Sequence, residues 1–170
     1  MALRNILKEG DERLRKKSRP VTDFNERLWT LLDDMYETMK DGGVGIAAPQ
    51  VGVLRRAVVI DVGEGKHELV NPVIVEQSGD QCGGEGCLSI PGISCEIERP
   101  DHVVVEAYDL NANLIRYEAS GDLFCVCLQH EIDHLHGNTM FERLKPMQRI
   151  KAVKEYQDAL ARGARPGETE

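Results

Sequence analysis

The 170-residue sequence has no apolar run close to the roughly 20 residues that a membrane-spanning helix requires. Its N-terminus lacks the apolar core and small-residue cleavage site of a signal peptide, so we expect a cytoplasmic protein. Positive charge is also scarce, because 21 Lys and Arg residues face 29 Asp and Glu residues and the net charge is −8. This balance argues against nucleic-acid binding across the whole surface. We therefore expect neither DNA nor a membrane among the partners.

The cysteines lack the pairing that a disulfide framework or a structural zinc module would show. Their number, five, is odd, and no two have the C-x-x-C spacing. We predict that Cys82, Cys95 and Cys125 are small buried residues with a structural role.

Apolar spacing and capping residues predict three helices. The first would begin at a capping box formed by Asp23 and Glu26, and the second would span about residues 120–137. The third would begin at Pro146, which suits the first turn of a helix. Its predicted apolar stripe is Met147, Ile150, Val153 and Leu160.

Short runs rich in β-branched residues predict strands over 57–62, 69–75, 103–108 and 114–119. Pro72 indicates an irregularity in the second run, and a glycine-rich stretch separates that run from the third. One helix, several strands and two further helices predict an α+β fold, with antiparallel or mixed sheets around the second helix and a C-terminal helix. Residues 1–170 would form a single catalytic domain, with residues 163–170 as a frayed tail.

The strongest chemical signal is an H-E-x-x-H pattern at residues 130–134, inside the second predicted helix. Two histidines four residues apart project from the same side of a helix, so His130 and His134 can share one metal ion. Glu131 follows the first ligand and can reach a water bound to that metal without being a ligand itself. The pattern therefore predicts a catalytic metal site.

Two histidines leave such a site one protein ligand short, because a catalytic metal usually takes three protein ligands and water. Cys87 lies between glycines and offers a thiolate, whereas Glu155 offers the carboxylate of a zinc peptidase. The residues alone leave both alternatives open. A structural zinc module is a third alternative, but it leaves Glu131 without a role.

Three segments together resemble the signature motifs of the peptide deformylase family. They are residues 43–50 (GVGIAAPQ), 85–89 (EGCLS) and 129–135 (QHEIDHL). They occur in the family's order and at similar separations, and the resemblance extends over residues 3–162. It implies a metal-dependent hydrolase that removes the formyl group from N-terminal formyl-methionine of nascent polypeptides and releases formate.

The resemblance also implies the metal site. By it alone, Cys87 is favoured over Glu155, and Cys87, His130 and His134 would hold one divalent ion. Ferrous iron would be the native metal, with zinc, nickel or cobalt as substitutes.

The family's reaction assigns roles to three further residues. Glu131 would take a proton from the metal-bound water and return it to the departing amine. The side-chain amide of Gln50 and the backbone N–H of Leu88 would stabilise the oxyanion.

The substrate would lie along an extended edge and in an apolar pocket. By resemblance, Val44 and Gly45 bond to the substrate backbone, with Gly86 on the opposite side. The residues that the resemblance assigns to substrate binding are Val44, Gly45, Glu85, Gly86, Leu123, Val126 and Cys127.

Two further features come from the resemblance. Arg99 matches a recurrent family arginine, and we predict that it braces the motifs through Asp133 or Glu85. The basic C-terminal helix, residues 147–162, is a candidate ribosome-docking element of a monomeric enzyme.

Overall fold

The computed structural model describes residues 2–167. Its helices are α1 (Glu26–Met39), α2 (Leu123–Leu135) and α3 (Pro146–Ala161), with short 3-10 helices η1 (Glu12–Arg15), η2 (Ala48–Val51) and η3 (Met140–Arg143). Its strands are β1 (Gly45–Ala47), β2 (Ala57–Ile60), β3 (His67–Ser78), β4 (Gln81–Cys87), β5 (Ile90–Arg99), β6 (His102–Tyr108) and β7 (Leu114–Ser120). The predicted α+β class with a C-terminal helix is confirmed.

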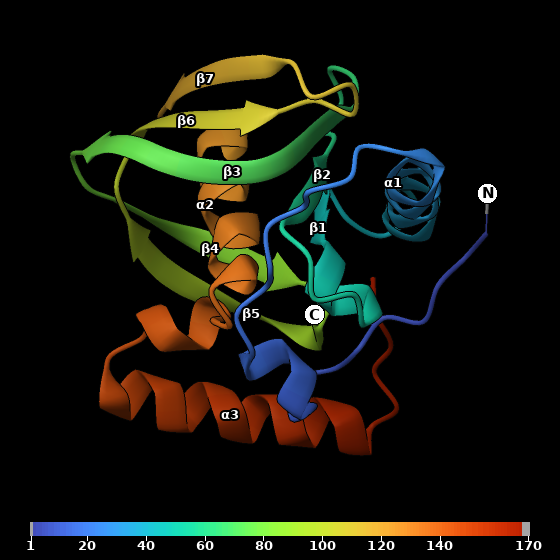
Figure 1. Ribbon diagram of the computed structural model, residues 1–170. Helices are drawn as coiled ribbons and strands as arrows, with labels where there is room; N and C mark the ends of the chain where they lie inside the picture. The colour runs from blue at the N-terminus through green and yellow to red at the C-terminus, as the bar shows by residue number, and fades with distance from the viewer. Residues whose placement is uncertain (1, 168–170) are drawn as a thin grey trace.

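The strands form two antiparallel sheets. The larger sheet has the order β1-β2-β3-β6-β7, and β4 and β5 form a separate two-stranded sheet. The helix α2 stands beneath the larger sheet, with β4, β5 and α3 toward its other end (Figure 1). The helix that carries the H-E-x-x-H pattern therefore occupies the centre of the fold.

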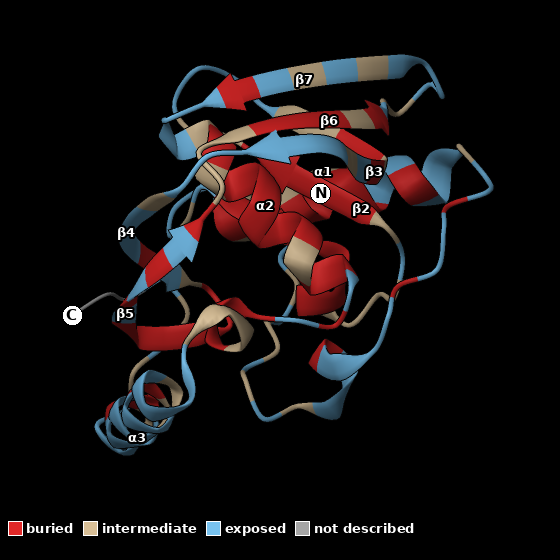
Figure 2. Ribbon diagram, turned by 90° about the vertical axis from the view of Figure 1, so that its left-hand side faces the viewer, coloured by how far each residue is buried: buried red, intermediate tan, exposed pale blue. Residues whose placement is uncertain are grey.

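Strand β2 shows how the core is divided. Successive side chains of a strand point to opposite faces. Val58 and Ile60 belong to the apolar cluster that contains residues of α2, whereas Ala57 and Val59 belong to the cluster that contains residues of α1. A third cluster lies between β5 and α3. Most of α2 is buried (Figure 2), and its buried residues include His130, Glu131 and His134.

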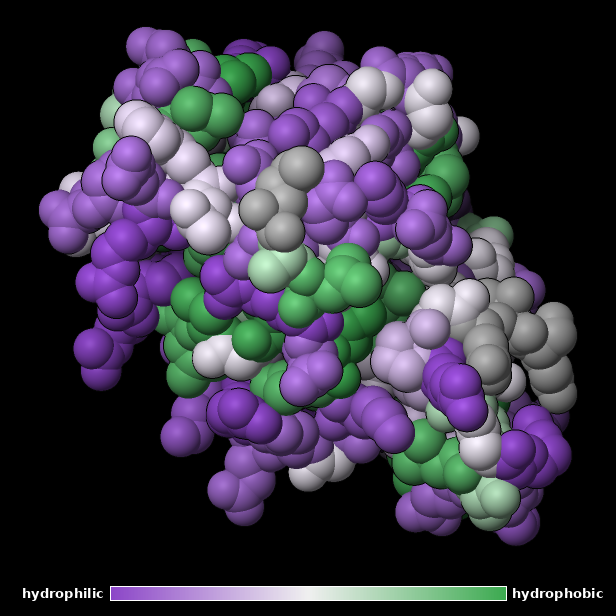
Figure 3. Space-filling view, turned by 90° about the vertical axis from the view of Figure 1, so that its right-hand side faces the viewer, coloured by the Kyte–Doolittle hydropathy of each residue, from purple (hydrophilic) through white to green (hydrophobic). Residues whose placement is uncertain are grey.

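Helix α1 packs against β1 and β2 through the apolar residues that its sequence pattern predicts. The buried set is Leu28, Leu31, Leu32, Met35 and Met39. The face of the molecule that carries α1 is mostly hydrophilic, with hydrophobic surface near its middle (Figure 3). The helix thus presents its polar side to the exterior.

The start of α1 differs from the prediction. The capping residue is Asn25, whose side chain accepts hydrogen bonds from the backbone N–H groups of Arg27 and Leu28. The predicted capping box of Asp23 and Glu26 is wrong, because Glu26 is already the first helical residue.

The apolar stripe predicted for α3 is wrong in its first half. Met147 is 78% exposed and Ile150 is 66% exposed. The buried side chains of this helix are instead Ala152, Tyr156 and Ala159, which pack in the cluster with β5. The small alanines let the helix approach the strand closely.

The glycine-rich stretch forms the β4–β5 hairpin, which the strand pattern did not predict. Glycine has a low strand propensity, so the sequence of β4, which contains Gly83 and Gly84, does not show the pattern of a strand. The irregularity predicted at Pro72 is confirmed, because the pairing of β3 with β6 shifts register between Val70 and Val73.

All five cysteines are free. Cys95 and Cys125 are buried as predicted, but Cys82 is exposed, so the prediction of burial is wrong for this residue. Its position in the small, outlying β4–β5 sheet explains the exposure.

Within residues 2–167, no helix has the length and apolar character needed to cross a membrane. Of the tail predicted to be frayed, residues 163–167 are described and residues 168–170 lie outside the described residues.

Candidate metal centre and active site

Three potential metal ligands from distant parts of the sequence meet beside α2. The ligand atoms of Cys87, His130 and His134 all lie within 4.8 Å of one another. The sulfur of Cys87 is 3.4 Å from Nε2 of His134. Cys87 is the last residue of β4, and the two histidines lie one turn apart on α2. The predicted sulfur and two ring nitrogens are therefore brought together.

The orientation of the His130 ring is set by Glu85. Nδ1 of His130 is 2.9 Å from Oε1 of Glu85, and both side chains are buried. With Nδ1 occupied by a carboxylate, Nε2 is the nitrogen left to face the sulfur of Cys87. A carboxylate behind a ligating imidazole fixes its tautomer and raises its basicity.

Arg99 links the Glu85 carboxylate to Asp133 on α2. Its guanidinium contacts Glu85 at 2.5 and 2.8 Å and Asp133 at 3.0 Å. Arg143 adds two bonds to Asp133, at 2.8 and 3.0 Å. The predicted brace through Asp133 or Glu85 is confirmed, and it uses both. Glu85 lines the cavity, as expected for a substrate contact, but its carboxylate points to Arg99 and His130.

Burial and neighbouring charges separate the pKa values of three adjacent groups on α2. Burial, and next the charge of His130, lower the pKa of His134 to about 3, so this ring is neutral and free to act as a ligand. Burial lowers the pKa of His130, but the surrounding acidic groups, Glu131 first, outweigh it and raise the pKa well above the usual value. Burial raises the pKa of Glu131 to about 7. The acidic groups around His130 thus favour positive charge at the centre of the site.

The carboxylate of Glu131 lies against the backbone of β1. A methyl group added to Gly45 would be 2.7 Å from Oε2 of Glu131, well inside normal contact. Oε1 of Glu131 is buried and has no hydrogen-bond partner among the described residues. Gly45 therefore makes room for the carboxylate, and one oxygen remains available to a ligand or water.

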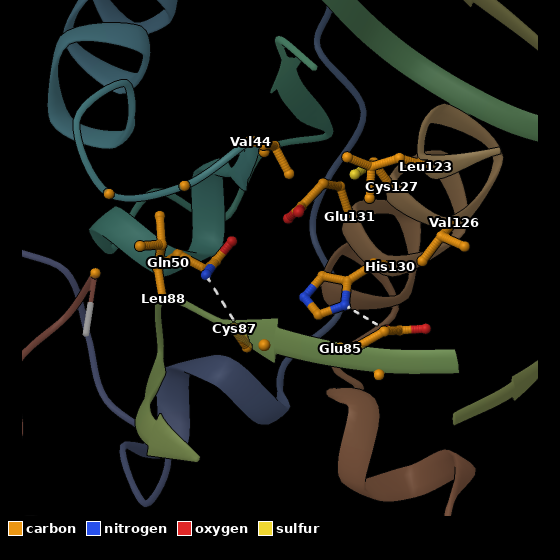
Figure 4. A pocket seen from close by; sticks show the side chains of 16 residues that line it. Val44, Gln50, Glu85, Cys87, Leu88, Leu123, Val126, Cys127, His130 and Glu131 are labelled. Carbon is orange, nitrogen blue, oxygen red and sulfur yellow. Dashed lines mark hydrogen bonds and ion pairs between the residues drawn. The ribbon is translucent and has the colours of Figure 1, made fainter. Parts of the chain in front are cut away.

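The amide of Gln50 is aimed at the same centre. Its Oε1 accepts the backbone N–H of Ala47 at 2.9 Å, which fixes the amide plane. Its Nε2 lies 3.1 Å from Oγ of Ser89 and 3.8 Å from the sulfur of Cys87 (Figure 4). Ser89 is fully buried; it belongs to the signature segment 85–89, but the sequence assigned it no individual role.

The N-terminal segment is hydrogen-bonded to the backbone at both Gln50 and Ser89. The backbone N–H of Leu7 bonds to the carbonyl oxygen of Gln50 at 2.7 Å, and that of Glu9 bonds to the carbonyl oxygen of Ser89 at 2.7 Å. These contacts join residues far apart in the sequence and outside regular strands, so no local pattern indicates them.

A cavity of about 230 Å³ opens beside the three ligands. Every predicted substrate-binding residue lines it, and so do Gln50, Leu88, His130 and Glu131. In Figure 4, Leu123, Val126 and Cys127 lie on one side of the cavity, and Gln50 and Leu88 lie on the other. The cavity therefore has an apolar end at Leu123, Val126 and Cys127, and the amide of Gln50 lies on its other side, with His130 between them.

Glu155 lies elsewhere. Its side chain is 47% exposed on α3 and is 4.0 Å from the ammonium group of Lys151. It does not belong to the group of ligand atoms formed by Cys87 and the histidines. The geometry therefore favours Cys87 as the third donor.

The residues present fit a divalent metal ion. A thiolate and two imidazoles suit borderline cations such as iron and zinc. Three protein ligands leave a position open, as catalytic sites do. Glu131 lines the same cavity, and its Oε1, which has no hydrogen-bond partner among the described residues, could accept a proton from water there.

The comparisons with known proteins all find members of one family. The family model described as polypeptide deformylase matches residues 3–150. The chain is 58% identical to a peptide deformylase of Acetivibrio thermocellus over 138 residues, 81% of this chain and 81% of the relative. It is 50% identical to one of Caldanaerobacter subterraneus over 159 residues, 91% of this chain and 99% of the relative.

Solved structures show the same likeness. A peptide deformylase from Legionella pneumophila is similar with a TM-score of 0.90 and 41% identity, covering 95% of this chain and 98% of that one. Another, from Ehrlichia chaffeensis in complex with actinonin, is similar with a TM-score of 0.87 and 36% identity, covering 93% of this chain and 98% of that one.

Proposed function

The chain belongs to the polypeptide deformylase family, and from this we propose that Cys87, His130 and His134 hold its catalytic metal while Glu131 transfers the protons. The enzyme is a hydrolase that removes the formyl group from the N-terminus of nascent polypeptides. The observation that carries the residue assignment is the convergence of the three ligand atoms within 4.8 Å of one another.

We propose ferrous iron as the native ion, with zinc, nickel or cobalt as substitutes. A set of one thiolate and two imidazoles accepts all four. When bound, such an ion lowers the pKa of coordinated water to about 7 and polarises the carbonyl oxygen of the formyl group.

Glu131 would act as base and then as acid. Its buried Oε1, without a partner among residues 2–167, accepts the proton of the attacking water. The oxygen of that water forms a bond to the formyl carbon. The same carboxyl group then donates its proton to the departing amine nitrogen as the C–N bond breaks, which leaves formate and a free N-terminus.

Gln50 and Leu88 would bind the oxyanion that develops on the formyl oxygen. The amide oxygen of Gln50 is held by Ala47, so Nε2 is presented to the centre without further reorganisation. Leu88 follows Cys87 directly and lines the cavity, so its backbone N–H would be the second donor. Removal of one such donor typically lowers kcat by about 100- to 1,000-fold.

The substrate would add to the free edge of β1. Among the described residues this strand pairs with β2 alone and is the edge of the larger sheet. The carbonyl oxygen of Val44 already accepts the backbone N–H of Asp61 at 2.8 Å, so an extended peptide would bond to the remaining edge groups of Val44 and Gly45. The methionine side chain would enter the apolar end of the cavity, lined by Leu123, Val126 and Cys127.

The partners follow from the reaction. Because the substrates are nascent chains, we propose that the enzyme is a cytoplasmic monomer that docks on the ribosome through α3. The helix presents Met147 and Ile150 to solvent, and its Lys151 and Lys154 are 80% and 76% exposed. Exposed cations beside apolar side chains suit a surface of RNA and protein.

The test is anaerobic purification with metal analysis, followed by assay of formate release from formyl-Met peptides. We expect Glu131→Ala to keep its metal and to lose activity by about 100- to 10,000-fold. Cys87→Ala should lose the metal, and Glu155→Ala should keep both metal and activity. A zinc peptidase with Glu155 as ligand predicts the reverse for the last two variants. Iron-loaded wild-type protein that releases no formate would contradict the proposed function.

A further inference from the structure

The chain that follows α3 turns back toward the active site. Gly163 has φ of 86°, and the backbone N–H of Ala164 bonds to the carbonyl oxygen of Ala159 at 3.0 Å, so the helix ends in a tight turn. A methyl group on Gly92 of β5 would lie 2.8 Å from Cβ of Ala164, which shows how closely the turn packs on the hairpin. From there the chain rises from α3 toward β1 and η2 (Figure 1).

This segment, residues 164–167, is called the tail below, and its last residue reaches the cavity. Gly167 lines the same cavity as Gln50 and His130. A methyl group on Gly42 would be 2.9 Å from Cα of Gly167, so two backbones meet there without a side chain between them. The tail lies beside the loop that leads into β1, on the side of the cavity away from Leu123 (Figure 4).

Burial along the β1 edge determines the direction in which a bound peptide extends out of the active site. Gly45 and the residues after it in β1 are buried, whereas Val44 is 38% exposed and Gly42 is exposed. A peptide paired with this edge, with its formyl end at the buried ligands, can continue only toward Gly42. Its second and third residues must therefore pass the point where Gly42 meets Gly167.

We propose that the tail forms a wall of the substrate channel and contacts the second and third residues of the formylated peptide. The inference rests on the proposed function and adds an element that the family model does not include, because the match ends at residue 150. Of the tail, Gly167 lines the cavity, and contact with its backbone would stabilise bound peptides of two or more residues without affecting the reacting atoms. The tail should therefore act on KM rather than on kcat.

The experiment compares formyl-methionine amide with formyl-Met-Ala-Ser on the iron-loaded enzyme. The first variant ends at Ala164, which keeps the packing on Gly92 and removes the residues that reach Gly42. We expect the ratio of kcat/KM for the long peptide to that for the amide to fall by about five- to tenfold, as expected for lost contact with one or two carbon groups. The change should lie in KM for the long peptide, and both constants for the amide should be unchanged.

A second variant moves the tail without deleting it. In Gly42→Ala the new methyl group must displace Gly167, and we expect the same fall in the ratio. The matched control is Gly83→Ala, because a methyl group there meets nothing within 4 Å. In a chain that carries both Gly42→Ala and the truncation, the ratio should equal that of the truncation alone, since the methyl group then has nothing to displace.

Three results would overturn the inference. The first is an unchanged ratio of kcat/KM values, long peptide to amide, in both the truncation and Gly42→Ala. The second is a rise of that ratio, which would mean that the tail obstructs the channel. The third is a double variant in which the effects of the truncation and of Gly42→Ala multiply. If the truncated chain does not fold, Gly42→Ala alone decides between these outcomes. Iron-loaded wild-type enzyme that hydrolyses neither compound would contradict the proposed function and this inference with it, whereas an active enzyme with an unchanged ratio contradicts the inference alone.

Discussion

Glu131 and Gly45 are fitted to each other: a methyl group at position 45 would stand 2.7 Å from the carboxylate oxygen Oε2. Gly45 does not have a positive φ, so the glycine is needed for space rather than for backbone conformation. The edge strand on which we place the substrate therefore also holds the residue that we propose as base. Both functions require that nothing larger than hydrogen occupies position 45.

This relationship predicts the effect of Gly45→Ala. The new methyl group pushes the Glu131 carboxylate away from β1, and displacement of a catalytic group by about 1 Å can lower the rate about 100-fold. We expect a loss of kcat of that order, with the metal content retained because no ligand is touched. Metal analysis and formate release on Gly45→Ala and on Gly83→Ala would check it. Loss of metal, or full activity in Gly45→Ala, would contradict the interpretation.

Arg99 is predicted to be a major source of stability. Its side chain is 1% exposed and joins the carboxylates of Glu85 and Asp133. Arg99→Met would leave buried negative charge without its partner, which typically costs about 3–5 kcal/mol. Arg143→Met is the matched control, because this side chain is 29% exposed and Asp133 would still have Arg99. Urea denaturation should show the larger loss for Arg99→Met, and equal losses would argue against the network.

The sequence was sufficient for the parts of the site that have a strong local pattern. The helical spacing of His130 and His134 is a local property, and the structure has a helix there with both rings on one side. The helix spans Leu123–Leu135 with Asp122 as its cap, within the predicted residues 120–137. The pairing of Arg99 was found in the sequence only through the family resemblance. Its two partners come from β4 and α2, and nothing in the local sequence links them.

Other parts could not be predicted because they depend on packing between distant segments. The glycines of β4 conceal a strand that exists because β5 pairs with it. The resemblance assigned Gly45 to the substrate edge, but only the structure shows that the Glu131 carboxylate packs against it. The hydrogen bond that Nε2 of Gln50 donates to Oγ of Ser89, at 3.1 Å, joins residues 39 positions apart and has no local signature.

Acid should weaken the attachment of the N-terminal segment. Burial raises the pKa of Asp34, but hydrogen bonds from the backbone N–H of Ala2 and from Arg4 outweigh it and lower the pKa below its usual 3.8. A carboxyl group whose pKa is lower in the folded state contributes stability above its unfolded pKa, and this contribution is lost as the pH falls through the folded value. The segment matters because Leu7 and Glu9 bond to the loops of the site.

We therefore expect Asp34→Asn to reduce the free energy of unfolding near neutral pH and to have a smaller effect as the pH falls below the usual 3.8 toward the lower folded pKa. Urea denaturation of both proteins at about pH 7 and at about pH 3 measures the difference. A difference that grows as the pH falls would contradict the sign of the pKa shift. Hydrogen exchange of residues 2–9 provides an independent check, since their amides should lose protection in the variant near neutral pH.

The docking role proposed for α3 predicts a charge-dependent association. Lys151 and Lys154 are 80% and 76% exposed, and their partners Glu155 and Asp158 lie 4.0 and 3.5 Å away at the surface, where such pairs are weak. Reversal of both lysines to glutamate should cause a steep loss of co-sedimentation with ribosomes, greatest at low salt because phosphate contacts are screened by ions.

The control reverses the same amount of charge on another face. Lys40→Glu with Lys66→Glu changes residues that pair near α1, with Glu37 and with Asp33 and Glu68. Both double variants should release formate from free peptides at the wild-type rate, because neither pair lines the cavity. Equal loss of co-sedimentation in the two variants would show that net charge alone governs binding, and no loss in either would remove α3 as the docking element.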